Sequence, residues 1–186
     1  PEIAKDVGNI FLNLGNKKDA LEWYKKALEI NDEYAPAFNN IAGLERQLGN
    51  HQEAVDLFKR AIQADPKLIQ AYVGAAASFL GLGDLDQAES LAAQALAINE
   101  DVPGVNEILG IIFQKKSNPD QAVKCYQKEL KVNPHASSSL LNLGLLLLQK
   151  GRVGAAIESL EKVSALAPSE QCSLLLAQAY QNLGQF

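Results

Sequence analysis

The sequence contains few of the residues that build disulfide, redox and metal sites. Its 186 residues include two cysteines and two histidines. Cys125 and Cys172 are too few for a disulfide framework, so we expect both to be small buried residues. This usage fits a reducing compartment, and we expect a cytoplasmic protein. His51 and His135 have no further ligand at metal-binding spacing, so we expect no metal and no cofactor.

Catalytic motifs are missing as well. Cys125 has no candidate base placed near it by the sequence, which argues against a nucleophile. The glycines of Gly81-Leu82-Gly83 lack the strand-to-helix setting of a phosphate-binding loop. We therefore expect that the chain is not an enzyme.

Long apolar runs and excess positive charge are also absent. The longest apolar run, around residues 140–148, is interrupted by Asn142, so we expect no membrane insertion. The net charge is −5, which argues against nucleic acid as a partner. The chain opens with Pro1 rather than methionine, and we interpret it as a fragment or a processed piece.

What the sequence does have is a period of 34 residues. When units are numbered from one to 34 starting at Pro1, alanine occupies position twenty five times without an insertion or deletion. These residues are Ala20, Ala54, Ala88, Ala122 and Ala156. Position eight is also small in every unit, with Gly8, Ala42, Ala76, Gly110 and Gly144. A fixed period of this length indicates stacked repeats, and the small residues let two helices approach closely.

Each unit carries two apolar stripes at helical spacing, separated by a turn. Position fifteen ends the first helix with Gly15, Gly49, Gly83, Ser117 and Gly151. Position sixteen is expected to cap the second helix with Asn16, Asn50, Asp84 and Asn118, the exception being Arg152. Three residues later, Glu53, Gln87 and Gln121 predict capping boxes.

The period predicts five whole repeats and part of a sixth in a single array over residues 1–186. The repeats are 1–34, 35–68, 69–102, 103–136, 137–170 and the partial 171–186. With one residue deleted, positions seven, eight, eleven, fifteen and seventeen of the last repeat are Leu176, Ala177, Tyr180, Gly184 and Phe186. A solenoid needs a polar capping element at each end, and none is present. We expect further chain, a partner or a second copy to cover the C-terminal end, which makes a homo-oligomer a candidate state.

This pattern resembles the tetratricopeptide repeat (TPR) over essentially the whole chain. Local departures are Glu45 in place of an aromatic, Ala92 at position twenty-four, and Glu129 and Val163 in place of alanine at position twenty-seven. The resemblance implies an all-α fold, an α-solenoid coiled as a right-handed superhelix of antiparallel helix–turn–helix units. It also implies that the first helix of each repeat lines a concave groove that holds peptides or proteins.

By helical geometry, positions two, five, nine and twelve of each first helix lie on a face other than the one that packs on the second helix. The resemblance implies that this face lines the groove. These positions are Glu2, Lys5, Asn9, Leu12, Pro36, Asn39, Gly43, Arg46, Gln70, Val73, Ala77, Leu80, Gly104, Glu107, Ile111, Gln114, Ser138, Leu141, Leu145 and Leu148. The predicted groove is polar toward the N-terminal end and apolar toward the C-terminal end.

Part of the polar end matches the carboxylate clamp of TPR co-chaperones. Lys5, Asn9 and Asn40 match its first three positions, whereas Gln70 and Gly74 replace its last two cations. We expect no tight capture of a chaperone tail, because each charge-assisted donor is worth about 1.5–3 kcal/mol. The alternative is that Asn39 and Asn40 donate amide hydrogen bonds to a peptide backbone or to neighbouring helices.

The apolar end contains a leucine row, Leu141, Leu145 and Leu148, with Ile111 beside it. One hypothesis is a hydrophobic seat for an amphipathic helix, an extended segment or a second copy of the chain. The alternative is that adjacent helices shield these side chains.

The leading functional hypothesis is a protein–protein interaction scaffold that binds a peptide segment or partner protein in the groove. One alternative is a recruiting TPR domain of a larger enzyme such as a glycosyltransferase, because Asn40 and Asn142 correspond to asparagines at position six of those arrays. The other alternative is a self-assembling scaffold.

Overall fold

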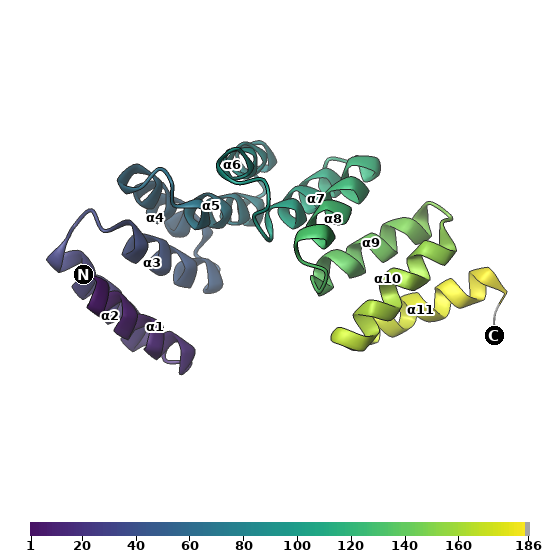
Figure 1. Ribbon diagram of the computed structural model, residues 1–186, viewed down its shortest axis with the longest axis horizontal. Helices are drawn as coiled ribbons and strands as arrows, with labels where there is room; N and C mark the ends of the chain where they lie inside the picture. The colour runs from purple at the N-terminus through teal and green to yellow at the C-terminus, as the bar shows by residue number, and fades with distance from the viewer. Residues whose placement is uncertain (185–186) are drawn as a thin grey trace. The chain divides into compact units, whose positions relative to one another are not determined.

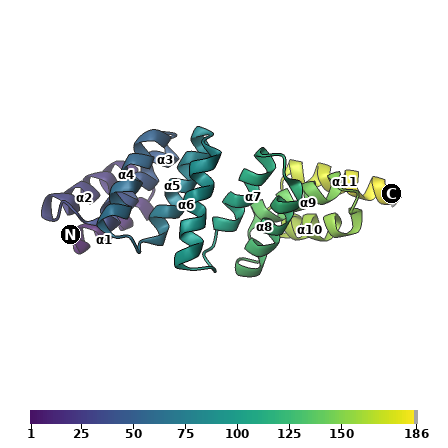
Figure 2. The same ribbon diagram turned by 90° about the horizontal axis from the view of Figure 1, so that it is seen from above.

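The computed structural model describes residues 1–184 as helices joined by short turns, with no strand in that range (Figures 1 and 2). The helices are α1 (Glu2–Asn13), α2 (Lys17–Ile30), α3 (Ala35–Gln47), α4 (His51–Ala64), α5 (Ile69–Leu82), α6 (Leu85–Ile98), α7 (Val105–Lys115), α8 (Pro119–Val132), α9 (Ser137–Gln149), α10 (Val153–Leu166) and α11 (Glu170–Leu183). The predicted all-α solenoid of helix pairs is confirmed. Phe186, assigned above to position seventeen of the sixth repeat, lies outside the described residues.

The 34-residue period sets the helix boundaries. The second helices α2, α4, α6, α8 and α10 all begin at position seventeen and end at position thirty of their repeats. Position fifteen has a positive φ in every turn, from +57° at Ser117 to +86° at Gly49. This left-handed residue ends the first helix as predicted, and it lets the chain reverse within a few residues.

Hydrogen bonds in these turns correct part of the capping prediction. Asn16, Asp84 and Asn118 each accept a hydrogen bond from the backbone amide three residues later, as expected of N-caps. Their own backbone N–H groups donate to the carbonyl five residues earlier, as in a Schellman turn. Asp84 and Asn118 thus make one half of the predicted capping boxes, but the backbone N–H that Gln87 or Gln121 would bind is already used. The Asn50 backbone N–H likewise donates to the Glu45 carbonyl, so the reciprocal bonds predicted for Glu53, Gln87 and Gln121 are wrong.

Asn50 is the exception among the predicted asparagine caps. Its side chain makes no cap hydrogen bond and instead donates to Glu45 Oε2 at 2.8 Å. Glu45 is buried at the position where other repeats carry an aromatic or leucine side chain. A buried carboxylate needs a donor, and this need redirects the asparagine away from the helix end.

In four of the five whole repeats, a small residue at position eight is matched by a large residue at position twenty-four, the exception being Ala92 in repeat three. A Cβ placed on Gly110 would lie 2.5 Å from Tyr126 Cε1, and one on Gly144 would lie 2.7 Å from Leu160 Cδ2. Tyr126 and Leu160 are both fully buried. The close approach of the two helices that the small residues predicted is therefore confirmed.

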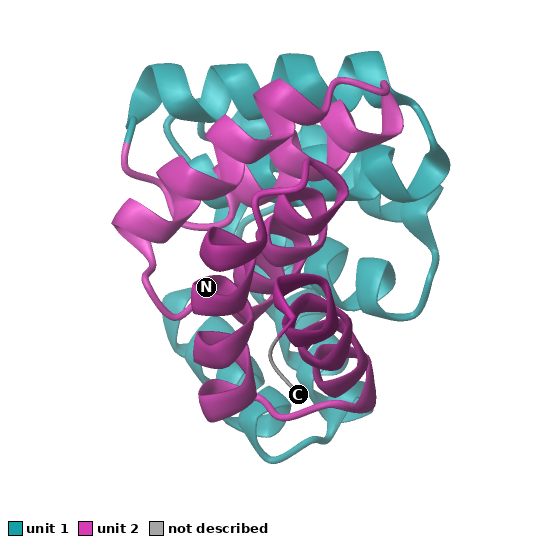
Figure 3. Cartoon of the chain, turned by 90° about the vertical axis from the view of Figure 1, so that its right-hand side faces the viewer, with its two compact units in different colours: residues 1–100 teal, residues 101–186 magenta. Residues whose placement is uncertain are grey.

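The chain divides into two compact units, residues 1–100 and 101–186 (Figure 3). Unit 1 contains α1–α6 and unit 2 contains α7–α11. Unit 2 opens irregularly, since Gly104 has a φ of +86° and forms the N-cap of α7. Gly104, predicted to face the groove from within a helix, thus lies before the helix.

Glu129 on α8 is a second buried carboxylate, only 1% exposed. Its Oε1 accepts a hydrogen bond from the Gly104 backbone N–H at 2.8 Å, and its Oε2 has no hydrogen-bond partner. The glutamate thus replaces a core alanine and ties α8 to the start of α7. Among residues 1–184, no helix has the length and hydrophobicity to span a membrane.

Candidate peptide-binding faces

The candidate face of unit 1 comes from the first helices of its repeats, α1, α3 and α5. Lys5 and Asn9 on α1 and Asn39 and Arg46 on α3 are half-buried, whereas Gln70 on α5 is exposed. Each lies one or two residues from a buried core position on the same helix. The rigid core therefore fixes the register of these side chains.

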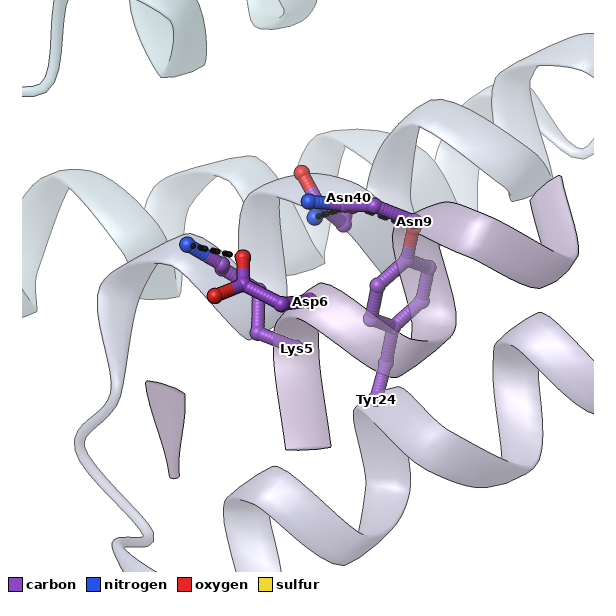
Figure 4. A network of polar contacts seen from close by, with 5 residues as sticks. All are labelled: Lys5, Asp6, Asn9, Tyr24 and Asn40. Carbon is purple, nitrogen blue, oxygen red and sulfur yellow. Dashed lines mark hydrogen bonds and ion pairs between the residues drawn. The ribbon is translucent and has the colours of Figure 1, made fainter. Parts of the chain in front are cut away.

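The most organised part of this face is an amide cluster formed by Asn9, Tyr24, Asn39 and Asn40, of which Figure 4 shows Asn9, Tyr24 and Asn40. Asn9 Oδ1 accepts two hydrogen bonds, from Tyr24 Oη at 2.8 Å and from Asn40 Nδ2 at 3.0 Å. Asn39 Nδ2 donates to Asn40 Oδ1 at 3.3 Å. Asn9, Tyr24 and Asn40 join α1, α2 and α3, so the amides of Asn9 and Asn40 serve contacts between helices.

The phenol of Tyr24 is the buried anchor of the amide cluster. The side chain is fully buried, and its burial raises the pKa of the hydroxyl above the usual value of 10.0. A neutral hydroxyl donates to Asn9 at any ordinary pH. This contact keeps Asn9 oriented toward its own repeat.

Cations in the clamp-like part of the face are paired or missing. Lys5 Nζ lies 2.9 Å from Asp6 Oδ1, and this contact raises the pKa of the lysine (Figure 4). At the last clamp position, a Cβ on Gly74 would overlap the Phe58 ring, with Cε2 at 2.8 Å. A long cationic side chain would therefore require the core to repack.

Two polar atoms on α3 have no partner. Asn39 Oδ1 and Arg46 Nε are buried, and neither makes a hydrogen bond. Sequence analysis placed both residues on the face, but it gave no signal that these atoms would be unsatisfied. They mark positions where a bound backbone could supply a donor or an acceptor.

The candidate face of unit 2 comes from α7, α9 and α11. Glu107 Oε2 accepts a hydrogen bond from Ser139 Oγ at 2.9 Å. Gln114 Oε1 accepts a short hydrogen bond from the hydroxyl of Tyr126. Burial of the Tyr126 ring, and secondarily the charge of Glu107, raise the pKa of that phenol. Asn142 is half-buried on α9.

The leucine row is half-buried. Leu141 packs against the buried cluster that includes Leu160 and Cys172, and Leu148 packs against the buried residues of both α8 and α10. Ile111 also packs against the α8 cluster. Leu145 is half-buried as well, but it belongs to neither cluster. Neighbouring helices shield the row in part and leave part of each side chain accessible.

Other hollows lie at the ends of second helices. One in unit 1 has a volume of about 260 Å³ and is lined by residues that include Phe38 and Arg60. One in unit 2 has a volume of about 330 Å³ and is lined by residues that include His135 and Lys162. Among residues 1–184, no three histidine, cysteine or acidic side chains are grouped as metal ligands. Both cysteines are buried, and neither forms a disulfide.

The repeat register, the helix pairs and the small-residue contacts define a tetratricopeptide-repeat protein. The chain belongs to the family of the C-terminal domain of cilia and flagella-associated protein 70, whose model matches residues 1–186. No curated protein matches the chain.

Solved structures share the fold at low sequence identity. PilF of Pseudomonas aeruginosa is 20% identical with a TM-score of 0.88, and the match covers 98% of this chain and 85% of that one. TTC0263 of Thermus thermophilus is 20% identical with a TM-score of 0.76, and the match covers 98% of both chains. YrrB, a TPR protein with an unusual peptide-binding site, is 19% identical with a TM-score of 0.66, and the match covers 87% of this chain and 92% of that one.

Proposed function

We propose that the chain is a non-catalytic protein-interaction module that binds a peptide segment or partner protein on the first helices of its repeats. The observation that carries the proposal is the repeated row of half-buried side chains at positions five, nine and twelve of these helices. A side chain that is neither solvated nor fully packed can gain further burial from a partner, at about 25 cal/mol per Å² of apolar surface. Several such rows side by side supply an extended contact surface.

The family name supports a setting in cilia or flagella, and it describes a C-terminal domain. Both the setting and the description fit a recruiting domain within a larger protein, and two cysteines without a disulfide fit the cytoplasmic side. Peptide binding by a protein of this fold has a precedent in YrrB. The proposal includes that residues 1–186 form a single array of repeats and that the chain forms a homo-oligomer. Light scattering tests the oligomeric state.

The test compares proteins captured from an axonemal extract by the wild-type chain and by face variants. Leu145→Gln is the best variant for unit 2, because Leu145 packs in neither buried cluster and its loss should spare the fold. Asn39→Ala is the corresponding variant for the face of unit 1. Glu158→Gln, on an exposed position of α10, is the matched control.

Quantitative mass spectrometry should show a set of proteins that the wild type and Glu158→Gln both retain. Leu145→Gln or Asn39→Ala should deplete that set by about tenfold or more, the loss expected when about 1.5 kcal/mol of contact energy disappears. Equal capture by all four chains would rule out binding on these faces. Circular dichroism confirms that each variant is folded.

A further inference from the structure

We propose that the face of unit 2 binds a segment in which a lysine or arginine lies next to aliphatic side chains, and that Glu107 receives the cation. The inference rests on the proposed function, because it names the chemistry of the partner at one of the proposed faces. It uses residues of unit 2 alone.

Glu107 is the one ionisable side chain in the facing rows of unit 2. Positions two, five, nine and twelve of the three first helices otherwise hold glycine, serine, glutamine and aliphatic residues. The full set is Glu107, Ile111, Gln114, Ser138, Leu141, Leu145, Leu148, Gln171, Leu174, Gln178 and Gln181, together with Gly104, the N-cap of α7. A partner that approaches these rows therefore meets a single formal charge, and that charge is negative.

The carboxylate is held in place without being neutralised. Ser139 Oγ donates to its Oε2 at 2.9 Å, which fixes the orientation of the group but brings no positive charge. The ion pairs Lys5–Asp6 and Lys150–Asp120 lie elsewhere on the described chain. Glu107 also contributes, after burial, to the raised pKa of the buried Tyr126 on α8. A half-buried carboxylate oriented by a neutral donor is arranged to accept a cation.

Aliphatic residues occupy the positions next to Glu107 in the repeat register. Ile111 lies one turn further along α7, and Leu141 occupies the equivalent position five on α9. On α11 the same position is Leu174, which is 64% exposed. Lysine and arginine pack their methylene stems on apolar surface while the charged end reaches a carboxylate. The face therefore fits a cation and its aliphatic neighbours together.

Other partner chemistries fit this face less well. An acidic segment would place like charges together, which is destabilising at short range. A wholly apolar segment would cover Glu107 and leave a desolvated charge without a counter-ion. A basic and aliphatic segment satisfies both the carboxylate and the leucine row.

A random-peptide library panned on the immobilised full chain provides the test. Enriched peptides should carry lysine or arginine adjacent to leucine, isoleucine or valine. The best peptide, labelled for fluorescence anisotropy, should bind Glu107→Gln at least about tenfold more weakly than wild type, as loss of a charge-assisted pair predicts. Glutamine still accepts from Ser139, so the fold should be retained. Glu158→Gln, which removes the same charge from an exposed site on α10, should bind like the wild type.

A second peptide, with norleucine in place of its cation, completes a double-mutant cycle. It should bind wild type and Glu107→Gln with equal affinity. Two results would overturn the cation assignment while the proposed function stands. The enriched peptides could lack cations, or they could bind Glu107→Gln as tightly as wild type yet lose affinity for Leu145→Gln. Peptides that bind all variants equally, or no enrichment at all, would overturn both proposals. Self-association abolished by Glu107→Gln would replace the peptide with a second copy of the chain.

Discussion

The close contact between α4 and α5 predicts that two glycine-to-alanine substitutions will have opposite effects on stability. Gly74 on α5 lies against Phe58, which is 2% exposed, and a Cβ at residue 74 would overlap its ring. Gly43 on α3 has no atom within 4 Å of the position that a Cβ would occupy. Both glycines lie in the middle of helices of unit 1, so their gain in helix propensity should be similar.

The magnitudes follow from two competing terms. Alanine gains about 1 kcal/mol over glycine inside a helix. Overpacking a buried site costs about 1–3 kcal/mol, because a ring that is enclosed on all sides cannot move aside. Gly43→Ala should therefore stabilise the chain by about 1 kcal/mol, since only the first term applies. Gly74→Ala keeps the same gain but also carries the overpacking cost, so it should destabilise the chain by up to about 2 kcal/mol.

Urea denaturation followed by circular dichroism gives the unfolding midpoint of each variant. Because neighbouring repeats are coupled as they unfold, the midpoints are compared with one common dependence of the unfolding free energy on urea concentration. In the Gly74→Ala background, Phe58→Leu should recover part of the loss, whereas Phe58→Leu alone should destabilise. If both alanine variants shift the midpoint upward by the same amount, the packing argument fails.

Three further predictions concern the amide cluster, the buried phenol of unit 2 and one turn. Tyr24→Phe should cost about 1 kcal/mol, and Asn9→Ala about 1–3 kcal/mol because it also leaves the Asn40 amide without its acceptor; a double-mutant cycle with no coupling would contradict the hydrogen bond. Because burial raises the pKa of Tyr126, the unfolded chain loses this proton first, so its stabilisation is complete below about pH 10 and is lost as the pH rises further. Unfolding measured across that range should therefore be less pH-dependent in Tyr126→Phe than in wild type, and equal slopes would argue against it. Ser117 has a φ of +57°, so Ser117→Gly should raise the free energy of unfolding by about 0.5–1 kcal/mol. A lower urea midpoint for this variant would contradict the prediction.

The fold was predictable because the same residue types recur at the same positions of each repeat. Small residues at position eight, turn residues at position fifteen and stops near position thirty-two recur, so one unit corroborates the next. The second helices begin and end at the same repeat positions throughout. Position fifteen could be assigned a left-handed conformation in advance, even where Ser117 replaces glycine.

The polar contacts were less predictable, because they depend on which atoms compete for a partner in three dimensions. Asn50 carries the residue type of a cap, yet the buried carboxylate of Glu45 claims its amide. Asn9 and Asn40 match a binding motif by position, yet they bond to each other. The Glu107–Ser139 contact joins two helices of neighbouring repeats and is invisible to spacing within one helix.

The contact between positions eight and twenty-four links two distant choices in each repeat. Gly8 faces Tyr24 and Gly110 faces Tyr126, so the large side chain on the second helix fills the space that glycine leaves on the first helix. Among relatives, substitutions at these two positions should therefore occur together, with a gain in volume at one accompanied by a loss at the other. Repeat three, with Ala76 and Ala92, has little bulk at both positions, yet both alanines are fully buried, so an enlarged side chain at either should cost stability.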